Sequence, residues 1–351
     1  MKRIVFVLGT RPEIIKLMPV IKECEKRNKH YQILFTNQHF SPNMSLDFFD
    51  EFSINKEKIF INDSNNILEF LNQYIYGPNN DFGNPEDLIV VQGDTRSAYY
   101  GALVGKMNDC KVFHIEAGLR TGDFNSPYPE EFYRVEISKL ATTYFTPTKI
   151  SYNNLVKEGV DELYVVQCGN TVIQSLILMD KKEQPKNNDI YVTIHRSENK
   201  PYMERIFTTI LDVAMSNEDY NFKIILHPNN YFRNAININY EELTDNIELI
   251  QPMSYNDFLD KLSSSKFIIT DSGGIQEECC HLKTFCFVLR DTTERPETMI
   301  CGYGELLKPN EVVRNVNVIN RGIKDYDNIR NNMKKNPYYD EECINKIMRR
   351  L

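Results

Sequence analysis

The sequence predicts an α/β protein with two Rossmann-like domains whose parallel sheets face a central cleft. Short apolar runs recur along the 351 residues, segments of helical periodicity separate them, and a charged, asparagine-rich stretch at 180–189 interrupts the pattern. Near-continuous runs of β-branched and aromatic residues are typical of strands buried on both faces of a parallel sheet. Alternation of strands and helices over this length predicts α/β domains, which bind ligands at the carboxyl ends of their strands.

The expected strands form two series, and each series is long enough for one sheet. They lie at 4–8, 31–36, 88–92, 111–115, 143–145 and 163–166, then at 190–194, 222–226, 247–250, 267–270 and 285–289. After the first strand, apolar residues follow at helical spacing, and Thr10 with Glu13 predicts a capping box at the helix start. We expect a first domain over 1–170, a second over 171–335 and a separate C-terminal segment over 336–351.

Charge and cysteine usage limit the classes of partner. The 41 Lys and Arg against 49 Asp and Glu give a formal net charge of −8, which argues against nucleic acid as a partner. No apolar stretch approaches the roughly 20 residues needed to cross a membrane, and the apolar run after Arg3 is too short for a signal peptide. Eight cysteines without metal-ligand spacing predict reduced thiols, a cytoplasmic protein and no metal.

Three carboxylates of the first half follow expected strands. Asp94 comes just after the strand at 88–92, Glu116 directly follows the strand at 111–115, and Glu130 lies in the loop beyond it. A single acidic residue at such a place is commonly a helix cap or a solvated charge. Three of them from neighbouring loops converge on one edge of the sheet, where crowding separates their pKa values. This arrangement predicts a site holding both a general acid and a general base.

The second half offers groups suited to a phosphate. A helix is expected to begin at Ser272, Gly273 and Gly274, where free N–H groups and the helix dipole favour an anion. The alternative is an ordinary glycine-rich turn between a strand and a helix, which would have the same sequence. Glu278, one turn later, could accept bonds from ribose hydroxyls or face solvent. Neither a Walker loop nor GxGxxG is present, so neither ATP nor NAD is indicated, and we expect no cofactor.

His195 and Arg196 follow the first strand of the second half, where an adjacent guanidinium favours phosphate over a metal ion. The alternative for His195 is a structural histidine, and the alternative for Arg295 is an ion-pair partner. No Ser-His-Asp or Cys-His arrangement and no carboxylate–histidine set with metal spacing stands out. We therefore expect neither a metalloenzyme nor a hydrolase with a covalent intermediate.

Taken together, these motifs resemble those of the non-hydrolysing UDP-N-acetylglucosamine 2-epimerase family, which has the two-domain GT-B fold. The resemblance covers nearly the whole chain. It rests on Gly-Thr-Arg-Pro-Glu at 9–13, His-Ile-Glu-Ala-Gly-Leu-Arg-Thr-Gly at 114–122, Pro-Glu-Glu at 129–131 with Arg134, Thr-Asp-Ser-Gly-Gly-Ile-Gln-Glu-Glu at 270–278 and Thr-Thr-Glu-Arg-Pro-Glu at 292–297.

The resemblance implies an isomerase that inverts C2 of a UDP-N-acetyl-hexosamine. Loss of the C2 proton and of UDP from C1 gives a 2-acetamidoglucal, and UDP adds back with a proton delivered to the opposite face. The resemblance also implies that the C-terminal segment packs back on the first domain and that the protein is a homodimer. The matching positions imply catalytic roles for Asp94, Glu116, Glu130, Arg134 and His195, with acid and base unassigned. They imply UDP or substrate binding by Arg11, Lys16, Phe258, Ser272, Gly273, Gly274, Glu278 and Arg295.

Several alternatives remain at this stage. The first alternative is the same reaction on a 6-deoxy UDP-N-acetyl-hexosamine, including an L-sugar, because no motif indicates recognition of the C6 hydroxyl. A hydrolysing relative and a non-catalytic nucleotide-sugar-binding protein rank lower, since the Thr-Arg-Pro-Glu turn and all three carboxylates are present. Gln38, Arg196 and His227 are candidates for a regulatory site, but Phe40 and Ser41 depart from the pattern of members regulated by their own substrate.

Overall fold

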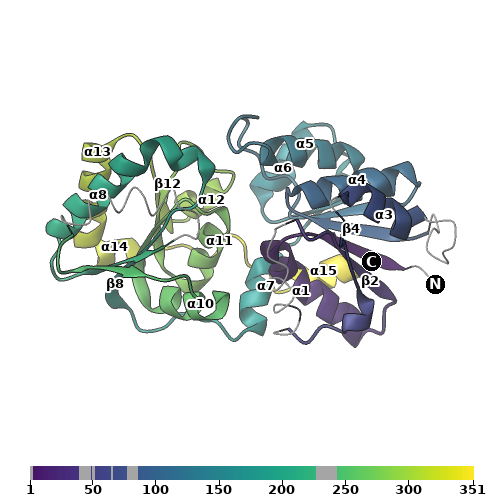
Figure 1. Cartoon of the computed structure of the whole chain (residues 1–351), viewed down its shortest axis with the longest axis horizontal. Coiled ribbons are helices and arrows are strands. Elements are labelled where there is room, and N and C mark those ends of the chain that lie inside the picture. Colours follow the sequence, from purple (N-terminus) through teal and green to yellow (C-terminus); the bar gives the residue numbers. More distant parts are fainter. Residues whose placement is uncertain (1–2, 39–48, 50–51, 65, 77–85, 227–242) are drawn as a thin grey trace. The chain divides into compact units, whose positions relative to one another are not determined.

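The computed structural model describes residues 3–38, 49, 52–64, 66–76, 86–226 and 243–351, which fall into two compact units (Figure 1). Unit 1 comprises Met1–Leu178 with Tyr338–Leu351, and unit 2 comprises Met179–Pro337. Each unit contains one parallel sheet flanked by helices, so the predicted α/β class with two parallel sheets is confirmed. Among the helices of the described residues, none is long and apolar enough to cross a membrane.

The sheet of unit 1 has the strand order β3-β2-β1-β4-β5-β6-β7. Its central strands consist almost wholly of buried apolar residues, as a sheet covered on both faces requires. The strands are β1 (Ile4–Leu8), β2 (Tyr31–Phe35), β3 (Ile59–Ile61), β4 (Leu88–Gln92), β5 (Lys111–Ile115), β6 (Thr143–Thr146) and β7 (Val165–Gln167). The order reverses direction between β1 and β4, which is where open parallel sheets bind ligands.

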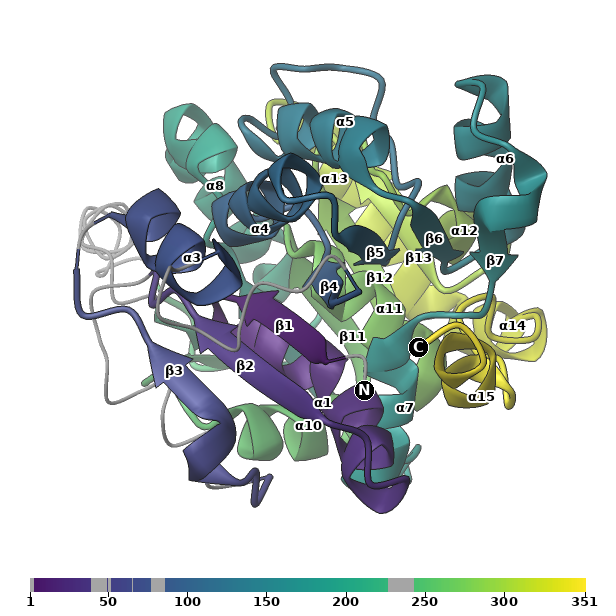
Figure 2. The same cartoon turned by 90° about the vertical axis from the view of Figure 1, so that its right-hand side faces the viewer.

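Two groups of helices cover this sheet. One group packs through a core that includes Val5, Val7, Ile89 and Val91 of the central strands, and Figure 2 shows it above the sheet. It consists of α3 (Ile67–Tyr76), α4 (Arg96–Met107) and α5 (Glu130–Leu140), with α6 (Lys149–Lys157) near the β7 edge. The other group consists of α1 (Arg11–Lys26), α7 (Thr171–Leu178) and the C-terminal α15 (Cys343–Met348), which pack on one another. Short 3₁₀ helices precede β3 and β7 at η1 (Lys56–Lys58) and η2 (Glu162–Tyr164).

The boundaries between the units differ from those expected at 170 and 335. Helix α7 belongs to unit 1 because it packs along α1, where the Ser175 hydroxyl donates to the Ile15 carbonyl at 2.6 Å. The C-terminal segment joins the same unit from Tyr338, whose ring is buried and whose carbonyl accepts from the Asn170 amide at 2.8 Å. The Gln174 side chain donates to the Asp340 carbonyl at 2.9 Å and extends this contact.

The sheet of unit 2 has the order β10-β9-β8-β11-β12-β13 and is also parallel throughout. Its strands are β8 (Asn187–Thr193), β9 (Asn221–Ile225), β10 (Ile247–Ile250), β11 (Ser265–Thr270), β12 (Phe285–Leu289) and β13 (Gly304–Leu307). A core rich in phenylalanine joins the sheet to α8 (Met203–Met215), α13 (Val312–Lys324) and α14 (Tyr326–Asn331). Further helical segments are η3 (Ser197–Tyr202), α10 (Tyr255–Ser264), α11 (Gly273–Leu282) and α12 (Pro296–Ile300).

Two edge strands, β3 and β13, are absent from the sequence prediction. Each has a neighbour on one side only and is only partly buried, so its run of apolar residues is short. All eleven predicted strands are present, and each agrees within three residues at either end.

Candidate active site

The loop after β5 places Glu116 against a lysine from α1. The Nζ of Lys16 lies 2.6 Å from Oε2 of Glu116, and both side chains are buried. The amide of Gln92, the last residue of β4, donates to the same carboxylate oxygen. Glu116 adopts a left-handed backbone conformation with φ of +66°, which side-chain-bearing residues rarely adopt and which the surrounding contacts must hold in place. Gln92 was not among the predicted site residues, because a polar residue ending a strand carries no specific signal.

Asp94, at the end of the neighbouring strand β4, is held by an arginine of α5. Its Oδ2 lies 2.6 Å from Nη2 of Arg134, and Nη1 of Arg134 lies 2.8 Å from Oε2 of Glu131. Glu130 precedes Arg134 by four residues and therefore shares its face of the helix. The structure thus brings together Arg134 and Asp94, both among the predicted site residues, and adds Glu131 beside them.

Glu131 also organises the loop before α5. Its Oε1 accepts hydrogen bonds from the backbone amides of Thr121 and Gly122, each at 3.0 Å. One buried carboxylate therefore ties together the guanidinium that binds Asp94 and the turn that follows β5. The adjacent Glu130-Glu131 pair gave no indication in the sequence of which residue takes this supporting role.

His114, on β5, supports the loop that carries Asp94. Its Nε2 lies 2.8 Å from the carbonyl oxygen of Gly93. Burial lowers the pKa of His114 to about 4, so the ring is neutral near pH 7. Because a carbonyl oxygen only accepts, Nε2 carries the proton and donates a hydrogen bond to the Gly93 carbonyl.

The predicted capping box at α1 does not form. The Thr10 side chain caps no amide of the helix, and its hydroxyl instead donates to Glu13 Oε2 at 2.8 Å. The same oxygen accepts from the Gly9 amide at 3.0 Å, while Oε1 accepts from the Thr95 hydroxyl at 2.7 Å. Glu13 is buried, and its carboxylate joins the loops after β1 and β4 in addition to accepting from the Thr10 backbone amide.

Two further predicted residues of unit 1 have different environments. Arg11 is the first residue of α1 and is exposed. The side-chain oxygen of Gln38 accepts from the amide and hydroxyl of Ser97, at 3.3 and 2.8 Å, so it supports the start of α4. The proposed regulatory set remains a prediction, because Arg196 belongs to unit 2 and His227 lies outside the described residues.

In unit 2, Asp271 organises the loop that carries His195 and Arg196. This fully buried carboxylate accepts from the backbone amides of both residues, at 3.1 and 2.9 Å, and from the side-chain amide of Asn199 at 2.9 Å. The Nδ1 of His195 lies 3.3 Å from Oδ1 of Asp271, while the imidazole remains partly exposed. Asp271 therefore orients the imidazole, whose predicted partner is a phosphate.

Of the two glycines that open α11, Gly273 lies against Arg295. A Cβ on Gly273 would sit 2.6 Å from Nη1 of Arg295, whereas a Cβ on Gly274 would meet none of the described atoms within 4 Å. Arg295 is buried and bonds Glu277 through Nε at 2.8 Å and Glu294 through Nη1. The ion-pair alternative for Arg295 is thus present in the structure, and its role in binding a ligand stays a prediction.

Glu278 and Phe258 lie on neighbouring helices, α11 and α10. Glu278 is buried, so the solvent-facing alternative is wrong, and its Oε1 accepts from the Tyr255 hydroxyl at 2.6 Å. Phe258 is half-buried, one turn of α10 beyond Tyr255. Tyr255 had no motif to mark it, although a hydroxyl bond of this kind orients the carboxylate that is predicted to bind ribose.

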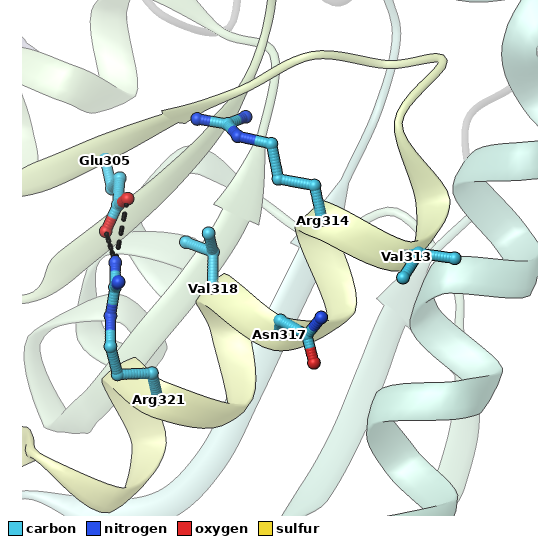
Figure 3. Close-up of a pocket in the computed structure, with 6 residues that line it drawn as sticks. All are labelled: Glu305, Val313, Arg314, Asn317, Val318 and Arg321. Atoms are coloured by element: carbon cyan, nitrogen blue, oxygen red, sulfur yellow. Dashed lines mark hydrogen bonds and ion pairs between the residues drawn. The ribbon is translucent and has the colours of Figure 1, made fainter.

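The structure also contains a surface groove that is separate from these residues. A groove of about 800 Å³ lies beside α13 and β13, and the Arg321–Glu305 ion pair, with 3.1 Å between N and O, forms part of its lining (Figure 3). None of the predicted site residues lines it. Within the described ranges, no group of three or more His, Cys, Asp or Glu residues could hold a metal ion.

Comparisons with known proteins agree on one family. The sequence profile of UDP-N-acetylglucosamine 2-epimerase matches residues 22–351. UDP-N-acetylglucosamine 2-epimerase of Methanocaldococcus jannaschii is 36% identical, over 87% of this chain and 88% of its own length. The enzyme of that name from Campylobacter jejuni is 33% identical, over 99% and 96%.

Solved structures agree as well. The crystal structure of UDP-GlcNAc 2-epimerase from Neisseria meningitidis bound to UDP-GlcNAc superposes with a TM-score of 0.85 at 31% identity, covering 100% of this chain and 99% of that one. The M. jannaschii UDP-GlcNAc 2-epimerase in complex with UDP-GlcNAc and UDP gives 0.79 at 32% identity, covering 99% of both chains. The fold class implied by the resemblance is confirmed, and the chain belongs to the UDP-N-acetylglucosamine 2-epimerase family.

Proposed function

We propose that the protein interconverts UDP-N-acetylglucosamine and its C2 epimer, UDP-N-acetylmannosamine. The observation that carries this proposal is the pair of supported carboxylates at adjacent strand ends, Asp94 on Arg134 and Glu116 on Lys16. Inversion at a carbon next to the anomeric centre needs a base that removes a proton and an acid that returns one. Each carboxylate has a fixed cation beside it, so its orientation is set before the substrate arrives.

In the proposed reaction, one carboxylate takes the C2 proton while the C1–O bond breaks and UDP leaves with the bonding electrons. A C1–C2 double bond forms and gives 2-acetamidoglucal. UDP then attacks C1, and a second group returns a proton to C2 from the opposite face. Asp94, Glu116 and Glu130 are the candidates for these transfers, and Arg134 orients Asp94. No metal or organic cofactor enters this scheme.

The second unit supplies groups for the leaving UDP. Ser272, Gly273 and Gly274 present the amino end of α11, which favours an anion. His195, oriented by Asp271, is proposed to contact the diphosphate, with Glu278 on the ribose and Phe258 beside the uracil. Arg11 is proposed to contact UDP from its exposed place at the start of α1.

The decisive experiment is incubation with UDP-N-acetylglucosamine in heavy water followed by proton NMR. Deuterium at C2 of both epimers with the UDP linkage intact is the expected result. Release of UDP and free N-acetylmannosamine would instead identify a hydrolysing enzyme. Parallel incubation with 6-deoxy UDP-N-acetyl-hexosamines tests the alternative substrates, and absence of exchange with every candidate would overturn the enzymatic proposal.

The assembly and location of the protein are also proposals. Membership of the family supports a homodimer, which sedimentation analysis would test by giving twice the chain mass of 41.2 kDa. A cytoplasmic location is supported by the eight cysteines, all of which are free thiols, and fractionation of cells expressing the full chain would test it.

A further inference from the structure

The carboxylate of Glu13 bonds to two loops of the candidate site. Through Oε2 it holds the loop after β1, accepting from the Gly9 amide at 3.0 Å and the Thr10 hydroxyl at 2.8 Å. Through Oε1 it holds the loop after β4, accepting from the Thr95 hydroxyl at 2.7 Å. Its side chain is buried, so these bonds are shielded from competition with water.

Thr95 connects this contact to the reacting groups. It follows Asp94 directly, and its hydroxyl oxygen also accepts from the Ala98 amide at 3.0 Å as the N-cap of α4. Asp94 is thus held on one side by Arg134 of α5 and on the other by a backbone that Thr95 anchors to Glu13. Two separate supports leave the Asp94 carboxylate little freedom to change direction.

We propose that Glu13 is a positioning residue for the reaction, which sets the place of Asp94 by tying the loop after β4 to the start of α1. This inference rests on the proposed epimerase function. Glu13 itself is buried within the two loops and acts through Thr95, so it is not a catalytic residue. Lys16, one turn along the same helix, binds Glu116, so α1 supports both carboxylates at once.

A purely structural capping role would use Glu13 differently. In a capping box the carboxylate would accept from the N-cap amide of α1 alone, whereas here, besides the Thr10 amide, it accepts from the Gly9 amide, one residue earlier, and from a hydroxyl of another loop. Burial raises the pKa of Glu13 to about 7, so an ionised carboxylate is unfavourable at this position. A neutral side chain would serve folding better, while the converging donors suit a carboxylate that holds loops in register.

The test compares Glu13→Gln with the wild type at pH 8, using C2 exchange and epimerisation rates. Because one carboxylate oxygen becomes an NH2 group, the variant loses the acceptor for one loop while keeping the side-chain volume. We expect kcat to fall by about 10-fold or more, as small misplacements of a reacting group cost up to about 100-fold. KM and the dissociation constant of UDP should stay within about twofold, and Glu13→Asp should recover part of kcat.

A matched control separates positioning from loss of a buried carboxylate. Asp87 directly precedes β4 and so lies at the opposite end of this strand from Asp94. It is buried, and its Oδ2 lies 2.6 Å from Nη2 of Arg3. Asp87→Asn should keep the wild-type kcat per folded molecule. Equal loss of kcat in Asp87→Asn and Glu13→Gln, or an unchanged kcat in Glu13→Gln, would overturn the inference.

A double-mutant cycle tests the route through Thr95. Glu13→Gln combined with Thr95→Val should lower kcat no further than the more damaging single variant, within about twofold, because the bond between the two side chains is the one through which both are inferred to act. Multiplied effects would show that the two residues act separately and would contradict the inference. Thr95→Ser keeps the hydroxyl and should restore the rate.

A readout independent of turnover distinguishes failure of this inference from failure of the proposed function. In protein labelled with carboxyl-¹³C aspartate, the Asp94 signal, assigned by its absence in Asp94→Asn, should move in Glu13→Gln and not in Asp87→Asn. If the wild type shows no C2 exchange, the epimerase proposal fails, and an unmoved Asp94 signal still overturns the positioning role.

Discussion

The ammonium of Lys16 and the carboxylate of Glu116 form a buried ion pair, with 2.6 Å between Nζ and Oε2. The two residues are 100 positions apart in the chain. The pair joins the first helix of unit 1 to the end of β5, where Glu116 is held in a left-handed conformation. It therefore supports both the fold of this edge and the direction of a proposed acid or base.

Breaking this pair from the lysine side should destabilise unit 1. In Lys16→Met, Glu116 stays buried but loses its cation, which costs about 3–5 kcal/mol at comparable sites. Adding Glu116→Gln should recover part of this loss, because the unpaired charge is gone. Urea unfolding gives both values. The control is Lys26→Met on the same helix, whose largely exposed ammonium lies 3.8 Å from Glu23 and should matter by less than about 0.5 kcal/mol. Equal effects of the two lysine variants would contradict the expectation.

Asp94→Asn and Glu116→Gln should lose turnover far more than UDP affinity. The proposed acid–base groups contribute about 10²–10⁴-fold to the rate, whereas the proposed UDP contacts lie mainly in unit 2. Kinetics of C2 exchange and calorimetry with UDP measure the two effects. Glu136→Gln, a partly exposed residue of α5 paired with Lys139, should leave both unchanged. Losses of similar size in rate and in affinity would argue against a role in proton transfer.

The two glycines at the start of α11 should respond differently to alanine. In Gly273→Ala the new methyl group would meet the buried Arg295 guanidinium, and such overpacking costs about 1–3 kcal/mol. In Gly274→Ala the methyl group meets none of the described atoms within 4 Å, so unfolding should be nearly unchanged. Both variants should weaken UDP binding, because a methyl group hinders close approach of a phosphate to the helix start. A stable Gly273→Ala protein with wild-type UDP affinity would contradict this account.

Stability should depend on pH through Glu13. Burial raises its pKa from 4.5 to about 7, so the folded state holds the proton more tightly than the unfolded chain. The resulting stabilisation is complete below about pH 4.5 and is lost as the pH rises through about 7; its size is on the order of 3 kcal/mol. Glu13→Gln removes this dependence. Hydrogen exchange of the β1 and β4 amides gives the free energy of opening in the wild type and in Glu13→Gln. The difference in this free energy between the two proteins should change from pH 5 to pH 8. A difference that stays constant with pH would refute the assignment of this pH dependence to Glu13.

Much of the fold could be predicted from local patterns. Runs such as Ile4–Leu8 and Phe285–Leu289 are apolar throughout because both faces of a covered parallel strand are buried, and both formed strands as expected. The edge strands Ile59–Ile61 and Gly304–Leu307 are half-covered, so their composition gave no comparable signal. The sequence likewise gave no sign that α7 belongs to unit 1, because this membership depends on packing against α1.

The sequence by itself determined the α/β class, the loops that carry Asp94, Glu116, Ser272 and His195, and the family. Each of these follows from residues close together in the chain, whose periodicity or motif is visible locally. Only the tertiary structure decided which partners these residues have, including Lys16 for Glu116 and Arg134 for Asp94. It also turned Glu13 from a predicted helix cap into a bond between two loops. A carboxylate binds whichever donors the folded chain brings within about 3 Å, and residues distant in sequence supply those donors.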